Sequence, residues 1–269
     1  MKNILFENWN ELTEEQQSIA KQQIEANPQI KPEDPHPASV FFNAFKWVKI
    51  ENFIDENMAA LLYQHTKLEV QRLAYLENSL GNQFIENPVL KEHFGQFGDA
   101  QAPGDFSKYG DPIFDSLLAI SLANVEKYTG TALVPNYTYH RLYTSGAILK
   151  RHIDRPSCEI SITLCLGYDV TNIDKNTYPN YDWPMFVKDE NGNELPIHMK
   201  PGDALIYRGC EIEHWRDPFP GLNHAQVFLH YNEKDGKYNI EFDGRPILGL
   251  PASFRAQTQW DITEGNVAE

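Results

Sequence analysis

The sequence predicts a mainly β protein with flanking helices, in which an antiparallel β-sandwich or barrel carries helices on its outside. Two observations carry this prediction. Helical periodicity is confined to the first half of the chain, and six or more short segments with the aromatic and β-branched character of strands follow it. Helices and strands that are segregated in this way favour a β core with helices packed against it.

The N-terminal region combines one short helix with an extended connector. The sequence Thr-Glu-Glu-Gln at 13–16 is a capping box, which predicts a helix that continues to about residue 26. Four prolines within 27–37 exclude a helix or a central strand, so we expect an extended connector there. The next stretch, 38–53, holds a cluster of aromatic residues that predicts one or two buried strands.

Two longer helices are expected before the strands begin. Apolar residues recur at helical spacing over 55–80. A second helix is predicted over 111–128, because Pro112 stands in its first turn and Gly130 follows its end. Between these helices, the glycines and aspartates of 95–110 predict a loop.

Strand patterning dominates the rest of the chain. Apolar and polar residues alternate through 158–168, which places Leu166 and Tyr168 on one apolar face of that strand. Pro201 and Gly202 occupy the positions that a type II turn requires. The predicted strands are 134–143, 158–168, 183–187, 197–199, 204–207 and 225–231.

Charge and cysteine content narrow the functional classes. With 23 Lys and Arg against 38 Asp and Glu, the formal net charge is −15. Such a surface repels phosphate backbones and anionic lipids, so we expect a small-molecule or peptide partner, no nucleic acid and no membrane. No apolar run approaches the length of a membrane span, and residues 1–11 are too polar for the apolar segment of a signal peptide. The odd number of cysteines, three, suits a reducing compartment. We therefore expect a cytoplasmic protein of unknown oligomeric state.

Three residues of metal-ligating types are distributed over the strand-rich half of the chain. His152 and Asp154 are two residues apart, so on a strand both side chains point to the same face. Taken alone, such a pair is more often a solvated strand end. His214, just after a predicted strand, favours a metal site, because two imidazoles and one carboxylate form a facial triad that leaves positions open on Fe(II).

The segments around these residues resemble a known family. Residues 143–154, Tyr-Thr-Ser-Gly-Ala-Ile-Leu-Lys-Arg-His-Ile-Asp, are similar to the first metal-binding segment of Fe(II)/2-oxoglutarate-dependent dioxygenases, and most of all to the prolyl 4-hydroxylase-like branch. Residues 200–214, from Lys-Pro-Gly-Asp to Glu-His, resemble the strand and turn that lead to the second metal histidine. The resemblance covers about 139–231. It implies a double-stranded β-helix, a jelly-roll or cupin-like barrel with the N-terminal helices packed outside.

The resemblance also implies roles for single residues. The metal ligands and catalytic residues would be His152, Asp154 and His214. Tyr143 would contact the 2-oxoglutarate region or the edge of the substrate. Tyr168 would bind the distal carboxylate of 2-oxoglutarate, with Leu166 beside it as a wall, although an ordinary strand-end aromatic is an equally good interpretation of Tyr168.

The anchor for the distal carboxylate departs from the family pattern. Ten residues after the second metal histidine the family has Lys or Arg, whereas this sequence has His224. A buried carboxylate needs a cation or several donors, so His224 would serve if protonated or as a neutral donor beside Tyr168. Arg216, two residues after the second metal histidine, is a second candidate, and Arg155 and Arg141 are further alternatives.

By resemblance, the chain is expected to be a hydroxylase that uses Fe(II), 2-oxoglutarate as cosubstrate, O2 and, as an option, ascorbate. It would hydroxylate a C–H bond with release of succinate and CO2. A peptidyl proline is the first expected substrate, and a small molecule or free amino acid is the second. The alternatives are a non-redox metal-dependent isomerase or lyase of cupin type, which a fourth ligand such as His230 would favour, and an inactive barrel that serves as a binding module.

We expect one domain over 1–269. It would comprise a helical or irregular support region over 1–130, the catalytic barrel core over 131–250 and a C-terminal tail over 251–269.

Overall fold

The computed structural model describes residues 36–81, 87–174 and 183–256. Its largest element is a seven-stranded antiparallel sheet, in which sequence-distant strands lie side by side. In spatial order the strands are β1 (Trp47–Ile50), β9 (Ala204–Tyr207), β6 (Ile160–Asp169), β11 (Asn223–Glu233), β4 (Leu133–Thr144), β3 (Phe106–Tyr109) and β2 (Gln96–Phe97).

A second, four-stranded antiparallel sheet packs against the first. Its strands, in spatial order, are β5 (Leu149–His152), β10 (His214–Arg216), β7 (Met185–Lys188) and β8 (Glu194–Ile197). The two sheets meet where the ring of His214 lies 4.7 Å from that of Tyr207. Among the described residues no strand pair joins the two sheets, so hydrogen bonds do not close them into one barrel. The prediction of a mainly β, antiparallel core with helices is confirmed.

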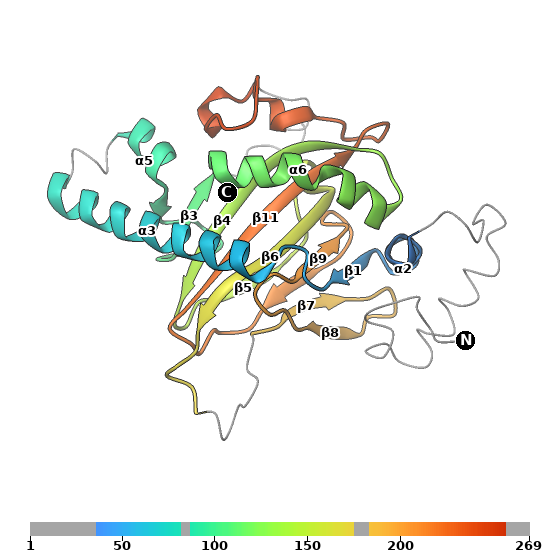
Figure 1. Ribbon diagram of the computed structural model, residues 1–269, viewed down its shortest axis with the longest axis horizontal. Helices are drawn as coiled ribbons and strands as arrows, with labels where there is room; N and C mark the ends of the chain where they lie inside the picture. Colours follow the sequence, from blue (N-terminus) through green and yellow to red (C-terminus); the bar gives the residue numbers. More distant parts are fainter. Residues whose placement is uncertain (1–35, 82–86, 175–182, 257–269) are drawn as a thin grey trace.

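Helices cover one face of the large sheet, where α3 and α6 lie across the strands (Figure 1). The α-helices are α2 (Pro37–Phe45), α3 (Glu56–Leu80), α5 (Pro88–Phe94) and α6 (Pro112–Thr129), and the 3-10 helices are η2 (Pro156–Cys158), η3 (Glu241–Gly244) and η4 (Ala252–Phe254). Ile160, Ile162 and Leu164 of β6 belong to the main hydrophobic core. None of the helices in the described part of the chain is both long and apolar enough to cross a membrane.

The two long helices begin and end where the sequence predicts. Asp55 caps α3, because its carboxylate accepts hydrogen bonds from the amides of Asn57 and Met58. Asp111 caps α6 in the same way, and Gly130 ends this helix in the left-handed conformation that glycine adopts without strain.

Two predictions about the N-terminal half are wrong. The first part of 38–53 is the helix α2 and only its second part is a strand, β1. Pro37 stands in the first turn of α2 and His36 caps its Ala38 amide, so the aromatic residues lie on a helix that packs against α6. The predicted loop at 95–110 contains the short strands β2 and β3, which extend the large sheet beyond β4.

The six strands predicted after residue 130 are present as β4, β6, β7, β8, β9 and β11, within a few residues of their expected bounds. The predicted helix at 13–26 and most of the connector at 27–37 lie outside the described residues. The division of 1–269 into a support region, a core and a tail stays a prediction.

Candidate metal centre

Three metal-ligating side chains meet where the small sheet packs against the large one. β5 ends at His152, β10 begins at His214, and the antiparallel register places these two residues opposite each other. Asp154 follows two residues after β5, and its Oδ1 lies 3.5 Å from the Nε2 atoms of both imidazoles. The ring centroids are 4.2 Å apart, and one ligand atom from each of the three residues lies within 4.8 Å of the others.

Backbone carbonyls fix the orientation of both imidazoles. Nδ1 of His152 lies 2.7 Å from the carbonyl oxygen of Lys150, and Nδ1 of His214 lies 2.9 Å from that of Ile212. Because a carbonyl oxygen only accepts, Nδ1 of each neutral ring carries the proton and Nε2 presents a lone pair. Histidines that bind metals are held by outer partners of this kind. Two lone pairs and a carboxylate oxygen that converge in this way fit a divalent metal ion.

Asp154 is held as a carboxylate. Burial acts to raise its pKa, but the neighbouring imidazoles of His214 and His152 lower the pKa of Asp154 well below its ordinary value. Its second oxygen, Oδ2, accepts a hydrogen bond from the Ser161 hydroxyl at 2.8 Å. Asp154 therefore turns one oxygen toward the imidazoles and the other toward Ser161.

A second group of metal-ligating residue types shares Asp154 with the first. Asp154, Cys158 and His230 also bring one ligand atom each within 4.8 Å of one another. The hydroxyl oxygen of Ser161 lies 2.8 Å from Asp154 Oδ2 and 3.0 Å from His230 Nδ1. Because this hydroxyl already bridges the carboxylate and the imidazole, a metal ion at this group would have to displace it.

A third group, formed by His65, Glu69 and Asp111, lies beside α3 and is filled by a lysine. The ammonium of Lys108 lies 2.7 Å from a Glu69 oxygen and 2.6 Å from an Asp111 oxygen. This buried cation takes the place that a metal ion would have between the two carboxylates. The triad of His152, Asp154 and His214 is therefore the best candidate metal centre in the described part of the chain.

A cavity of about 390 Å³ reaches the triad. Its walls come from both sheets, from α5 and from the C-terminal part of the described chain. Five aromatic side chains line it: Tyr109, Tyr137, Tyr139, Tyr207 and Phe228. Four cations line it as well: Lys91, Lys108, Arg141 and Arg155.

Arg141 on β4 forms an ion pair with Asp99 in the cavity wall. The guanidinium also donates to the Gln101 side chain at 3.0 Å, and it lies 5.0 Å from the centre of the Tyr139 ring. The Tyr139 hydroxyl donates to Asp99 as well. Both charges of the pair are therefore compensated within the protein.

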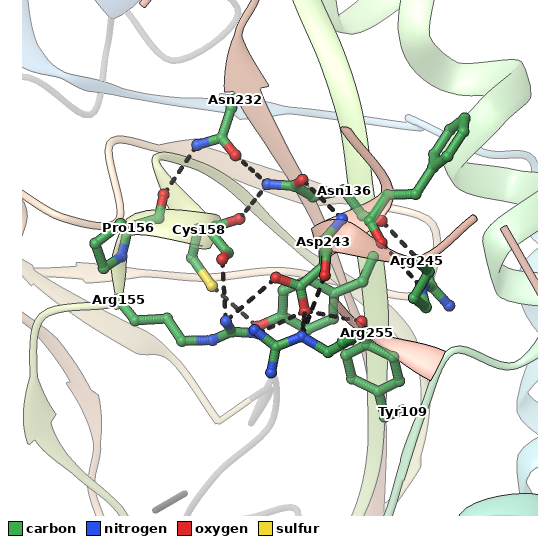
Figure 2. Close-up of polar contacts among 12 residues, drawn as sticks. Tyr109, Asn136, Arg155, Pro156, Cys158, Asn232, Asp243, Arg245 and Arg255 are labelled. Atoms are coloured by element: carbon green, nitrogen blue, oxygen red, sulfur yellow. Dashed lines mark hydrogen bonds and ion pairs between the residues drawn. The ribbon is translucent and has the colours of Figure 1, made fainter. Parts of the chain in front are cut away.

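The buried Asp243, in the C-terminal part of the described chain, binds two residues that line the cavity, Arg155 and Tyr109 (Figure 2). Its Oδ2 accepts hydrogen bonds from Arg155 at 3.0 Å and from the Tyr109 hydroxyl at 2.8 Å, and the Arg255 Nε lies 2.8 Å away. Arg155 and Tyr109 line the cavity, as does Ala252 of η4. Residues beyond the sheets thus fix side chains next to the candidate metal centre.

Five side chains predicted to contact 2-oxoglutarate lie outside this cavity lining, whereas the alternative anchors Arg141 and Arg155 belong to it; the five are Tyr143, Leu166, Tyr168, Arg216 and His224. Three of them are buried around Trp183: the rings of Tyr143 and His224 lie 5.0 and 5.1 Å from the Trp183 ring, and the Arg216 guanidinium lies 4.6 Å from its centre. Arg216 also donates to the Trp183 carbonyl. Tyr168 stacks on His224 at 5.4 Å.

The structure favours a neutral His224. Burial, and then the charge of Arg216, lower the pKa of His224 well below its ordinary value. Within the described residues, Nδ1 of His224 and Nε2 of Gln226 have no hydrogen-bond partner, although both atoms are buried. Buried polar atoms in this state favour a polar ligand that satisfies them.

A β-bulge at Leu166 changes the face that alternation predicts for Tyr168. Ala225 pairs with Gly167 whereas Gln226 pairs with Cys165, so β6 carries one extra residue, Leu166, at this point. Before the bulge Leu164 pairs with Val227, and after it Tyr168 pairs and stacks with His224, which lies three residues from Val227 and therefore on the other face of β11. The expectation that one apolar face continues along the strand to Tyr168 is wrong, because simple alternation does not continue through a bulge.

Several residues around the triad are absent from the set predicted from the sequence. Ser161 could have been identified from the sequence, because it lies on the polar face of the alternating strand. The structure shows that its hydroxyl on this face contacts Asp154. Asp99 and Gln101 lie in the stretch predicted to be a loop. Tyr207 ends a predicted strand, and nothing in its local sequence indicates that it packs against His214.

Comparisons with known proteins identify solved structures with a similar fold but no family model and no curated relative. No protein-family model matches the chain. No curated protein matches it either.

Three solved structures with a similar fold are informative. A prolyl-4-hydroxylase from Pseudomonas putida is 16% identical with a TM-score of 0.50, over 71% of this chain and 95% of that chain. A prolyl hydroxylase from Trichoplax adhaerens, in complex with a hypoxia inducible factor oxygen degradation domain peptide fragment, is 14% identical with a TM-score of 0.50, over 86% and 97% of the two chains. AviO1 from Streptomyces viridochromogenes Tue57 is 13% identical with a TM-score of 0.52, over 77% and 98%. The chain thus has the fold of prolyl hydroxylases.

Proposed function

We propose that this protein is a non-haem Fe(II)- and 2-oxoglutarate-dependent oxygenase that hydroxylates a C–H bond and releases succinate and CO2. The observation that carries the proposal is the convergence of His152, Asp154 and His214, with both Nδ1 atoms bound to backbone carbonyls and both Nε2 atoms facing Asp154 Oδ1. The fold shared with prolyl hydroxylases supports it. We also assign the two packed sheets to the double-stranded β-helix of those enzymes.

The three triad residues would hold the metal through two neutral nitrogens and one carboxylate oxygen. Fe(II) bound there would supply the open coordination positions and the redox chemistry needed to oxidise a C–H bond with O2 and 2-oxoglutarate. The role of the protein is to fix these ligands and to exclude water. Both imidazoles are held by carbonyls, Asp154 is held by Ser161, and the aromatic lining of the cavity limits access for water.

We propose Arg216 as the anchor for the distal carboxylate of 2-oxoglutarate, with His224 as a neutral donor. Arg216 follows His214 by two residues on β10, so the two side chains share a face of the strand. It is buried, and its charge lowers the pKa of the nearby His224.

For the substrate we propose a peptidyl proline first and a small molecule or free amino acid second. Two of the similar folds are prolyl hydroxylases, and one of them is in complex with a peptide fragment. The net charge of −15 supports a partner other than nucleic acid. A fourth protein ligand would favour a non-redox metal enzyme, and the residue suggested for that role, His230, instead contacts Ser161 through Nδ1.

The proposal is tested by adding Fe(II) and 2-oxoglutarate to the purified protein without oxygen. We expect the weak visible charge-transfer band of the metal-bound keto acid, followed by succinate release when oxygen is admitted. Asp154→Ala and His214→Ala should abolish both signals, because each removes a ligand atom. His198→Ala, at an exposed histidine outside the triad and the cavity lining, is the matched control and should keep both.

Either of two results would contradict the proposal. One is a wild-type protein that binds Fe(II) but never forms the band with 2-oxoglutarate. The other is a folded His214→Ala variant whose band and succinate yield equal those of His198→Ala.

A further inference from the structure

Ser161 lies between the candidate metal centre and a histidine that lines the cavity. Its hydroxyl is fully buried and lies 2.8 Å from Asp154 Oδ2, 3.0 Å from His230 Nδ1 and 3.0 Å from the carbonyl oxygen of Cys158. A hydroxyl has one proton to donate and two lone pairs that accept. The Tyr207 hydroxyl interacts with Ser161 as well. These contacts therefore cannot all be satisfied by Ser161 acting as a donor.

The charge of Asp154 decides the direction of these hydrogen bonds. A hydrogen bond to a carboxylate is stronger than one to a neutral acceptor, and the Asp154 contact is the shortest of the three. If Ser161 donates to Asp154, its lone pairs face His230, and the favourable partner for a lone pair is an N–H. If Ser161 donated to His230 instead, a lone pair of its hydroxyl would face the negative Oδ2 of Asp154.

The direction of these hydrogen bonds also determines which nitrogen of His230 is left as an acceptor at the cavity. His230 lines the cavity wall, where its ring lies 4.5 Å from that of Tyr137. In a neutral imidazole only one nitrogen carries a proton, so a proton on Nδ1 leaves Nε2 as an acceptor. Nε2 of His230 has no hydrogen-bond partner among the described residues. It is also absent from the buried atoms that lack a partner, so this nitrogen keeps some exposure.

We propose that His230, Ser161 and Asp154 form a directed hydrogen-bond relay, in which Nδ1–H of His230 donates to Ser161 and Ser161 donates to Asp154 Oδ2. Ser161 is then a positioning residue for the metal carboxylate. The relay also makes His230 an acceptor toward the cavity, suited to a substrate with an O–H or N–H group near the reacting carbon. This last role rests on the proposed oxygenase function, whereas the relay itself does not.

The experiment reads the protonated nitrogen of His230 directly. Metal-free protein is labelled with 15N at both histidine ring nitrogens, and long-range 1H–15N correlation spectra are recorded near neutral pH, with His230→Phe used to assign the signals. We expect His230 to be neutral with its proton on Nδ1. A proton on Nε2, or on both nitrogens, overturns the proposal, and this wild-type result does not depend on any variant of Ser161 folding.

Variants then test the link to Asp154. Ser161→Ala should remove the preference of His230 for the Nδ1–H form and weaken Co(II) binding by about 10- to 100-fold, as loss of an outer partner of a metal ligand does. Ser116→Ala, an exposed serine on α6, is the matched control. Tyr207→Phe removes the other hydroxyl that interacts with Ser161 and should leave the His230 form unchanged.

The outcomes separate this proposal from the function. If Ser161→Ala leaves both the His230 form and the Co(II) affinity at wild-type values, the relay is refuted even when the Fe(II) and 2-oxoglutarate band is present. If the band is absent but the Nδ1–H form and its dependence on Ser161 are observed, the oxygenase function fails and the relay stands.

Discussion

Gly209 shows how little space a single residue leaves around the candidate metal carboxylate. A Cβ atom at this position would lie 2.4 Å from Asp154 Oδ2 and 2.3 Å from the carbonyl oxygen of Cys158. We therefore expect Gly209→Ala to displace the carboxylate and to weaken Co(II) or Fe(II) binding by about 10- to 100-fold, measured by titration. Gly98→Ala is the control, since a Cβ atom at that position would have no described atom within 4 Å. Equal affinities in the two variants would show that the site adapts.

Arg216 carries the second prediction at the scale of one residue. If its guanidinium binds the distal carboxylate of 2-oxoglutarate, Arg216→Leu leaves that charge without its partner, which costs about 3 kcal/mol or more. The 2-oxoglutarate concentration that half-saturates the anaerobic charge-transfer band should then rise on the order of 100-fold. Arg72→Leu, at a half-exposed arginine on α3, is the control. An unchanged half-saturation in Arg216→Leu would move the anchor to His224 or Arg141.

Single residues also show what sequence reasoning can reach at the site. The spacing of His152 and Asp154, the position of His214 after a strand and the resemblance of both segments to a known family together select the three residues that the structure brings together. Their support cannot be selected in the same way. Ser161 and Gly209 act through contacts between segments that are distant in sequence, and nothing local marks a serine or a glycine for that role.

At the scale of elements, periodicity predicts long helices better than short ones. α3 and α6 have capping residues and enough turns to show their period, whereas α2 has nine residues and an aromatic composition that also suits a strand. The bulge in β6 leaves no trace in the alternation of the sequence, so the face of Tyr168 could not be predicted. The strands β2 and β3 are two and four residues long, too short for a recognisable pattern.

The ion pairs of His65 on α3 predict a dependence of stability on pH. The carboxylates of Asp111 and Glu69, whose oxygens lie 3.5 and 3.4 Å from its Nε2, raise the pKa of His65 to about 9, above its value of about 6.5 in an unfolded chain. A group whose pKa is raised on folding stabilises the protein below its unfolded pKa, and this contribution is lost as the pH rises through the folded pKa. We expect the free energy of unfolding to fall between about pH 6.5 and pH 9 for this reason.

The measurement is urea denaturation at several pH values in that window, for the wild type and for His65→Gln. The variant should lose less stability than the wild type over the same range, because a neutral amide does not titrate. His93→Gln, at an exposed histidine on α5, serves as the control and should follow the wild type. Parallel curves for wild type and His65→Gln would refute the assignment.

At the scale of the whole molecule, Asp243 joins the C-terminal part of the described chain to the wall of the cavity. Its carboxylate binds Arg155 beside the triad and Arg255 near the end of the described residues. Asp243→Asn removes the charge that both guanidinium groups share, so we expect residues 241–256 to detach more often and trypsin to cleave faster after Arg245 or Arg255. Cleavage sites and rates are read by mass spectrometry. Asp235→Asn, at an exposed aspartate, should be cleaved at the wild-type rate, and an equal rate for Asp243→Asn would contradict the prediction.

The position of Asp243 and Ala252 along the chain has a consequence for biosynthesis. A ribosome synthesises the three candidate metal ligands well before the segment that completes the cavity wall. A nascent polypeptide halted after β11 would therefore carry all three triad residues beside a cavity that is still open to solvent. The cavity should be completed only after translation of residues 241–256, and a metal ion bound at the triad before that moment would be exposed to bulk water.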